Sequence, residues 1–290
     1  MSEHFWRGGV GLGDIALRYR GRIAVTWLLL LGEALLILLV PLAIGHTVDT
    51  LLQERIEGVY VLGALCMLIL VFGAGRRFWD TRAYSRIYHD LGTSLVGFHA
   101  AAGTATGTLS ARVALLYEVV EFFEEYVPEL LGGIVAFIGV LLILGAIDLE
   151  VMGLSLGATA LVAVIYLLSG GRITDYTRHQ NDEIERRVDV LSAGSRRRID
   201  IHFRRLMKWN IRLSDLETLC FSLVWIVLAA LLVTSIVLIV QNPAVSAGRK
   251  VTSIMYVFQY MEVVMGFPLI YQQLVRLREI MQRLSKMEET

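Results

Sequence analysis

The stretch CFSLVWIVLAALLVTSIVLIV, residues 220–240, contains no charged side chain. As an α-helix it would extend for about 30 Å, which is the thickness of the hydrocarbon core of a bilayer. The stretch therefore predicts a membrane-spanning helix. A soluble alternative would need several such helices buried in one small domain, which is disfavoured because long, fully apolar helices are scarce in soluble proteins.

Five other stretches have the same character, so the chain is expected to be an all-α membrane protein with six transmembrane helices. The whole sequence is 56% hydrophobic with a mean hydropathy of +0.61, against about 45–50% apolar residues in soluble domains. Its two cysteines, Cys66 and Cys220, lie in apolar runs and are expected to be small buried hydrophobes, not metal ligands. The predicted spans are approximately residues 23–52, 59–79, 127–147, 149–170, 220–240 and 251–271.

The distribution of basic residues predicts the orientation of the spans. The short connections 53–58, 148–150 and 241–250 hold only Arg55, Arg249 and Lys250, and the remaining basic residues lie on the other side. Basic residues concentrate in cytoplasmic connections. Both termini are therefore expected in the cytoplasm, with the chain in a bacterial inner (plasma) membrane.

The cytoplasmic connections are long and have the composition of helices. Segments 80–126 and 171–219 lack proline and are rich in helix-forming residues and oppositely charged i,i+4 pairs. We expect the spans to continue as helical extensions over residues 80–126, 171–219 and 272–290. Small residues predict turns at 100–106 and 192–195.

Four local motifs accompany this layout. They are LGDIALRY (residues 12–19), PLAIGHTVDTL (41–51), TGTLSARV (106–113) and LVRLREIMQRL (274–284). Together with the six spans they resemble the transmembrane domain of type-1 ABC exporters. The resemblance implies an elbow helix within residues 1–22, followed by a six-helix domain over 23–290. It also implies a domain-swapped homodimer in which spans four and five pack on the partner around a central cavity.

Two features depart from that family. Thr108 stands where the family's T-G-D-L pattern has an acidic residue, and no G-x-x-x-x-G-K-[ST] phosphate-binding motif occurs. The chain ends at Thr290, where the family's ATPase domain would begin. On this basis the chain resembles stand-alone exporter-like membrane domains, including proton-driven peptide importers.

Two carboxylates are expected near the middle of the bilayer, where a charged group usually faces a cavity or a partner. Glu33 lies about 16 Å into span one and Glu262 about 18 Å into span six. Our hypothesis is that both line the cavity and bind a cation, a basic substrate group or a proton. Gln259, Met255 and the neighbouring Tyr256 would complete the wall. The alternative is that each carboxyl group is neutral and hydrogen-bonded in helix packing.

A second acidic feature precedes span three. Glu118, Glu121, Glu125 and Glu129 recur at i,i+3,i+7,i+11, with Glu124 beside them. The stripe could pass protons toward the cavity, or it could form ion pairs with basic stripes. Those basic residues are Arg76, Arg77, Arg82 and Arg86, or Arg204, Arg205 and Lys208.

Two further polar groups admit simple explanations. The basic run at 196–198 with Arg204 and Arg205 could dock a separate ATPase or contact anionic lipid headgroups, whereas nucleic-acid binding is not expected. His46 and Asp49 could hold a cation, but such a pair is usually only a polar helix end.

Three functions remain open. The leading prediction is a secondary transporter: a homodimeric permease for a small organic, peptide or cationic substrate, driven by a proton or ion gradient. The alternatives are the membrane subunit of a split ABC transporter and a channel or regulatory membrane protein. No catalytic constellation stands out, so neither an enzyme nor a cofactor is expected.

Overall fold

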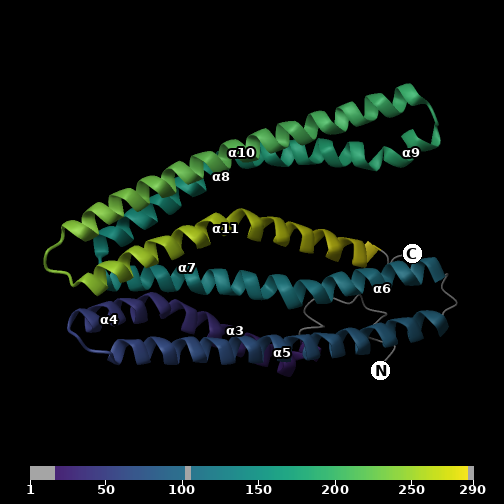
Figure 1. Cartoon of the computed structure of the whole chain (residues 1–290). Helices are drawn as coiled ribbons and strands as arrows, with labels where there is room; N and C mark the ends of the chain where they lie inside the picture. Colours follow the sequence, from purple (N-terminus) through teal and green to yellow (C-terminus); the bar gives the residue numbers. More distant parts are fainter. Residues whose placement is uncertain (1–16, 102–105, 287–290) are drawn as a thin grey trace. The chain divides into compact units, whose positions relative to one another are not determined.

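The computed structural model describes residues 17–101 and 106–286, and this part of the chain is helical apart from short turns (Figure 1). The predicted all-helical fold is confirmed. Most of the motif at 12–19 lies outside the described residues. The elements are α3 (Arg20–Leu38), α4 (Val40–Leu52), α5 (Glu57–Ala101), α6 (Thr106–Glu121), the π-helix η1 (Phe122–Tyr126), α7 (Val127–Ile147), α8 (Leu149–Glu185), α9 (Arg187–Ser192), α10 (Arg196–Gln241) and α11 (Ala247–Lys286).

Five helical stretches, some of which join two neighbouring elements, are long and apolar enough to cross a membrane. They are Arg20–Leu52, Glu57–Gly97, Leu116–Ile147, Leu149–Ser192 and Arg196–Gln241. The sixth predicted span falls within α11, which has 40 residues. The longest helix, α10, has 46 residues and so measures about 69 Å. A helix of that length reaches well beyond a hydrocarbon core of about 30 Å.

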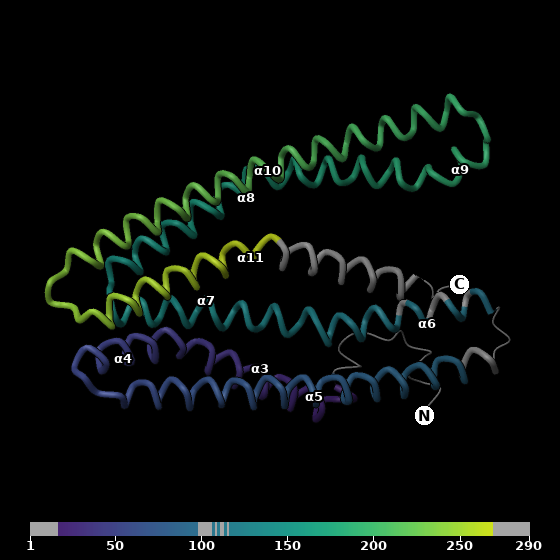
Figure 2. The backbone as a smooth tube through the Cα atoms, viewed as in Figure 1, coloured from purple at the N-terminus to yellow at the C-terminus, as the bar shows by residue number. Residues whose placement is uncertain are grey.

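The chain forms two compact units, and residues 145–242 make up the second. Within it α8 and α10 pack as an antiparallel hairpin whose path is traced in Figure 2. Gly194 has a φ of +62°, the left-handed conformation that glycine adopts most easily. It lies in the connection between α9 and α10, where the sequence predicts a turn.

The first unit contains residues 1–144 and 243–290. Here α5 packs against α3 and α4, while α11 packs against α4 and α6. α5 ends at Ala101 and α6 begins at Thr106, and the turn expected between them lies largely outside the described residues. The first predicted span is interrupted at Leu39, two residues before Pro41.

Spans one and six are joined at the α4–α11 contact, which we call the α4–α11 clasp. A Cβ added to Gly45 would lie 1.9 Å from the Thr252 hydroxyl oxygen, so only glycine permits this approach. Thr252 donates a hydrogen bond to the Pro41 carbonyl (3.0 Å), and Tyr256 donates one to the Leu38 carbonyl (2.7 Å). These carbonyls flank the interruption at Leu39, so α11 satisfies backbone groups where span one is broken.

Asp49 belongs to the same clasp. Its carboxylate accepts hydrogen bonds from the Ser246 hydroxyl (2.6 Å) and from the backbone N–H of Gly248 (2.7 Å). It thereby caps the first turn of α11, where backbone N–H groups have no partner within the helix. This capping role explains the polar end of span one.

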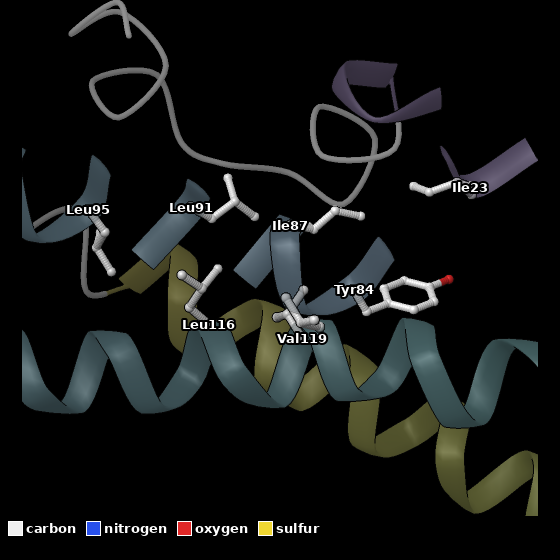
Figure 3. Packing of buried hydrophobic residues seen from close by; sticks show 8 residues of the cluster. Ile23, Tyr84, Ile87, Leu91, Leu95, Leu116 and Val119 are labelled. Carbon is white, nitrogen blue, oxygen red and sulfur yellow. The ribbon is translucent and has the colours of Figure 1, made fainter. Parts of the chain in front are cut away.

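An apolar cluster joins α5 and α6 farther along this unit (Figure 3). Tyr84 lies at one end of the cluster, with its hydroxyl oxygen pointing away from Leu91 and Leu95. The buried members are Ile23, Tyr84, Ile87, Leu91, Leu95, Leu116, Val119 and Val120.

Candidate functional site

The first unit contains a cavity of about 550 Å³ beside the interruption in span one. It is formed by α3, α5, η1 and α7, and its wall combines aliphatic side chains with charged ones. The lining residues are Leu30, Glu33, Ala34, Ile37, Arg76, Arg77, Asp80, Thr81, Glu124, Glu125, Pro128, Glu129 and Gly132. We call this cavity the acidic pocket, because it has five carboxylates and two guanidinium groups.

A three-residue ionic network lies at the α3–α5 side of the pocket. Arg76 forms an ion pair with Glu33 on α3 and a second one with Asp80 on its own helix, at 3.1 Å. The three side chains are mostly buried, with exposed fractions of 18%, 15% and 6% respectively. One guanidinium group therefore serves two buried carboxylates, and the network has an excess of one negative charge when all three groups are ionised.

The packing of the helices positions Glu33. A Cβ added to the buried Gly73 would lie 2.7 Å from the Glu33 Oε1 atom. The glycine thus leaves space for the carboxylate between α3 and α5. A larger residue at position 73 would force Glu33 to move away from its present contacts.

The other acidic residues of the pocket come from η1 and α7. Glu124 is partly buried, whereas Glu125 and Glu129 are exposed. The π-helical turn at Phe122–Tyr126 alters the register of the helix at this point, since a π-turn adds an i→i+5 step to the 3.6-residue repeat. Glu124 lines the pocket with Glu125 and Glu129, whereas Glu118 and Glu121 are not among its lining residues. A proton path along the acidic stripe stays a prediction.

The basic stripes have different partners. Arg76 and Arg77 line the pocket with the glutamates, but the ion pairs of Arg76 are with Glu33 and Asp80. Pairing of the acidic stripe with these arginines stays a prediction. Arg82 instead lies over the Phe78 ring, 3.2 Å from its centroid. In the second unit, Arg204 pairs with Asp200 (2.9 Å) and Arg205 with Glu183 (3.9 Å).

The residues predicted on span six lie on two faces of α11. Tyr256 is fully buried in the α4–α11 clasp, whereas Met255 and Gln259 are partly buried. The Gln259 side-chain oxygen is buried without a hydrogen bond from the described residues. Glu262 is exposed and is not among the residues that line the acidic pocket. Its sharing of one site with Glu33 stays a prediction.

Sequence reasoning did not identify Asp80 as a site residue. It follows the apolar run of span two and looks like the first charged residue of a solvated extension. In the structure it is only 4% exposed. The one available signal was its i,i+4 spacing from Arg76, which places both side chains on one helix face.

Long apolar helices and a charged pocket among them are typical of a membrane component of a transport system. The family model of the ABC transporter transmembrane region matches residues 12–248 of the chain. The chain therefore belongs to this family of transporter membrane domains. No curated protein matches the sequence.

Proposed function

We propose that this chain is a membrane permease that moves a small organic, peptide or cationic substrate and binds it, or the ion that drives it, in the acidic pocket. The observation that carries the proposal is the excess of carboxylates around a cavity of about 550 Å³. That volume lies in the usual range for small-molecule sites, about 300–1,000 Å³. Carboxylates in excess favour cations, amines and guanidinium groups.

Competition between Arg76 and a bound cation or proton for Glu33 would couple ligand binding to a change in the contact between α3 and α5. Arg76 forms ion pairs with both Glu33 and Asp80. A cation or a proton that binds to Glu33 would weaken its attraction for Arg76 and leave the guanidinium group to Asp80 alone. Substrate or ion binding would thus change the contact between α3 and α5, and a ligand moves a conformational equilibrium only through such a difference in interactions.

We propose a homodimer located in a bacterial inner membrane, with both termini in the cytoplasm. The α8–α10 hairpin supports the dimer, because apolar side chains such as Leu167 and Leu168 are largely exposed along it. Large apolar surfaces of this kind are covered by lipid or by another protein. By the family resemblance, part of that surface would pack against the partner.

The testing experiment is uptake or efflux of cationic dyes and peptides in proteoliposomes with an imposed pH gradient and no ATP. We expect gradient-dependent, saturable transport that is lost in Glu33→Gln and, if Glu262 shares the site, in Glu262→Gln. Glu150→Gln, at an exposed position at the start of α8, is the matched control and should transport normally. Linear, non-saturating flux would instead indicate a channel.

A second candidate function is the membrane subunit of an ATP-driven transporter with a separately encoded ATPase. Family membership favours it, as does the exposed basic run Arg196–Arg198 at the start of α10. Transport that requires an added partner ATPase and ATP, with none driven by a gradient, would establish this function and would refute the gradient-driven proposal.

A further inference from the structure

The two arginines of the acidic pocket have different surroundings. Arg76 pairs with Glu33 and Asp80 and is mostly buried. Arg77, the next residue on α5, is exposed and lines the same cavity. Within residues 17–101 and 106–286, its guanidinium group forms no ion pair. Consecutive residues of a helix point in different directions, so Arg77 does not share the partners of Arg76, and its positive charge is available to the pocket.

The three glutamates of the pocket come from η1 and the first turn of α7. They are Glu124, Glu125 and Glu129. None of them forms an ion pair with another described residue. The charges that act on Glu124 belong to other carboxylates, namely Asp80, Glu121 and Glu125. The pocket thus has a positive pole at Arg77 on α5 and a negative pole on η1 and α7, and the two poles are not paired with each other.

These unpaired charges define the ligand that fits. Apart from the Arg76 network, the lining residues carry one positive and three negative charges when all are ionised. A simple cation would pair with the glutamates, but Arg77 would repel it. A molecule with one carboxylate and two or more amine or guanidinium groups pairs with both poles, and such complementarity of charge gives an interface its specificity.

The chemistry of arginine and the size of the cavity support the same class of ligand. A guanidinium group can hold a carboxylate through two parallel hydrogen bonds, which an ammonium group cannot do. A sphere of 550 Å³ is about 10 Å across, and an extended dipeptide spans about 7 Å. One small molecule can therefore reach both poles.

We propose that the acidic pocket binds a basic zwitterion, whose carboxylate pairs with Arg77 while its cationic groups pair with the glutamates of η1 and α7. Basic amino acids and short basic peptides belong to this class. Arg77 is then the residue that distinguishes such a substrate from a plain cation. The inference deepens the proposed function and rests on it for the statement that the bound molecule is transported.

The experiment is isothermal titration calorimetry with the purified full-length protein in detergent. The probes form two matched pairs: arginine with agmatine, which lacks the carboxylate, and lysylarginine with its C-terminal amide, in which a neutral group replaces the carboxylate. We expect each free acid to bind at least tenfold more tightly than its counterpart, because the counterpart cannot form the charged hydrogen bonds with Arg77. Citrulline, which keeps the carboxylate but lacks the side-chain cation, should also bind at least tenfold more weakly than arginine.

Variants separate recognition from support of the fold. Arg77→Gln should lower the affinity for both free acids to that of their counterparts, and should leave or raise the affinity for agmatine because a repelling charge is gone. A residue that only supported the fold would weaken all probes alike. Glu129→Gln should weaken every cationic probe and keep the preference for free acids. Arg86→Gln is the matched control, because Arg86 is exposed on α5 and is not a lining residue, and it should bind the probes as the wild type does.

Three results would overturn the inference: equal binding of the free acids and their counterparts by the wild type, an unchanged preference in Arg77→Gln, or binding of none of the probes. Proteoliposomes distinguish it from the proposed function. Transport of cationic dyes that depends on Glu33 but shows no preference for a carboxylate would refute the role of Arg77 and leave the proposed function. Binding of the free acids through Arg77 without any transport would do the reverse.

Discussion

Replacement of Arg76 by methionine is the sharpest test of the ionic network. Methionine retains much of the apolar stem and removes the guanidinium group, so Glu33 and Asp80 both lose their ion-pair partner. Removing one partner of a buried pair destabilises a protein by about 3–5 kcal/mol. Since these side chains are 6–18% exposed, water relieves part of that effect, and we expect about 3 kcal/mol.

The assay is thermal unfolding in detergent, in N-methyl-glucamine chloride so that alkali cations do not replace the lost charge. For domains of 150–250 residues, 1 kcal/mol corresponds to about 2–4 °C, so the Tm of Arg76→Met should fall by roughly 6–12 °C. Adding Glu33→Gln and Asp80→Asn removes the unpaired charges. The triple variant should therefore recover at least half of the loss.

The matched control is Arg55→Met. Arg55 pairs with Glu57 in an exposed position, where an ion pair contributes little, and its Tm should equal that of the wild type. A Tm for Arg76→Met within about 2 °C of the wild type would refute the reasoning. So would a triple variant no more stable than Arg76→Met, because the damage would then be due to lost packing and not to unpaired charge.

Two further substitutions test the α4–α11 clasp. Gly45→Ala places a methyl group 1.9 Å from the Thr252 hydroxyl, and in the unfolding assay it should destabilise the protein by about 1–3 kcal/mol. The control is Gly63→Ala, where nothing lies within 4 Å of the added methyl group. This variant should be neutral or slightly stabilising in the same assay. Tyr256→Phe removes the hydrogen bond to the Leu38 carbonyl and should lower the free energy of unfolding by about 1 kcal/mol. Amide hydrogen exchange around the interruption of span one should become faster. Unchanged exchange there would contradict the assigned hydrogen bond.

The helices were predictable because the bilayer demands a fixed apolar length. The run at 220–240 lies within α10. Span one was predicted as continuous, and its interruption at Leu39 lies two residues before Pro41, which lacks a backbone N–H group. Gly194 marked the turn before α10. The helix α10 and this turn depend on local sequence, which is why the pattern of residues revealed them.

The pocket was only partly predictable. Glu33 was identified from its depth, and Glu125 and Glu129 from their spacing, but the π-turn at Phe122–Tyr126 contains no proline or glycine to announce it. The ion pair between Glu33 and Arg76 joins residues 43 positions apart. Such a pairing depends on how α3 crosses α5, and one sequence does not contain that information.

The α4–α11 clasp also has a mechanical consequence. It holds α11 at its first turns, between Gly248 and Tyr256, while the helix continues to Lys286. From Tyr256 onward the helix extends for about 45 Å, and it packs against α6 as well as α4. A rotation of about 5° about the contact with α4 would carry the far end of this length through about 4 Å, so a small adjustment around Gly45 would reach α6 as a displacement as wide as a side chain.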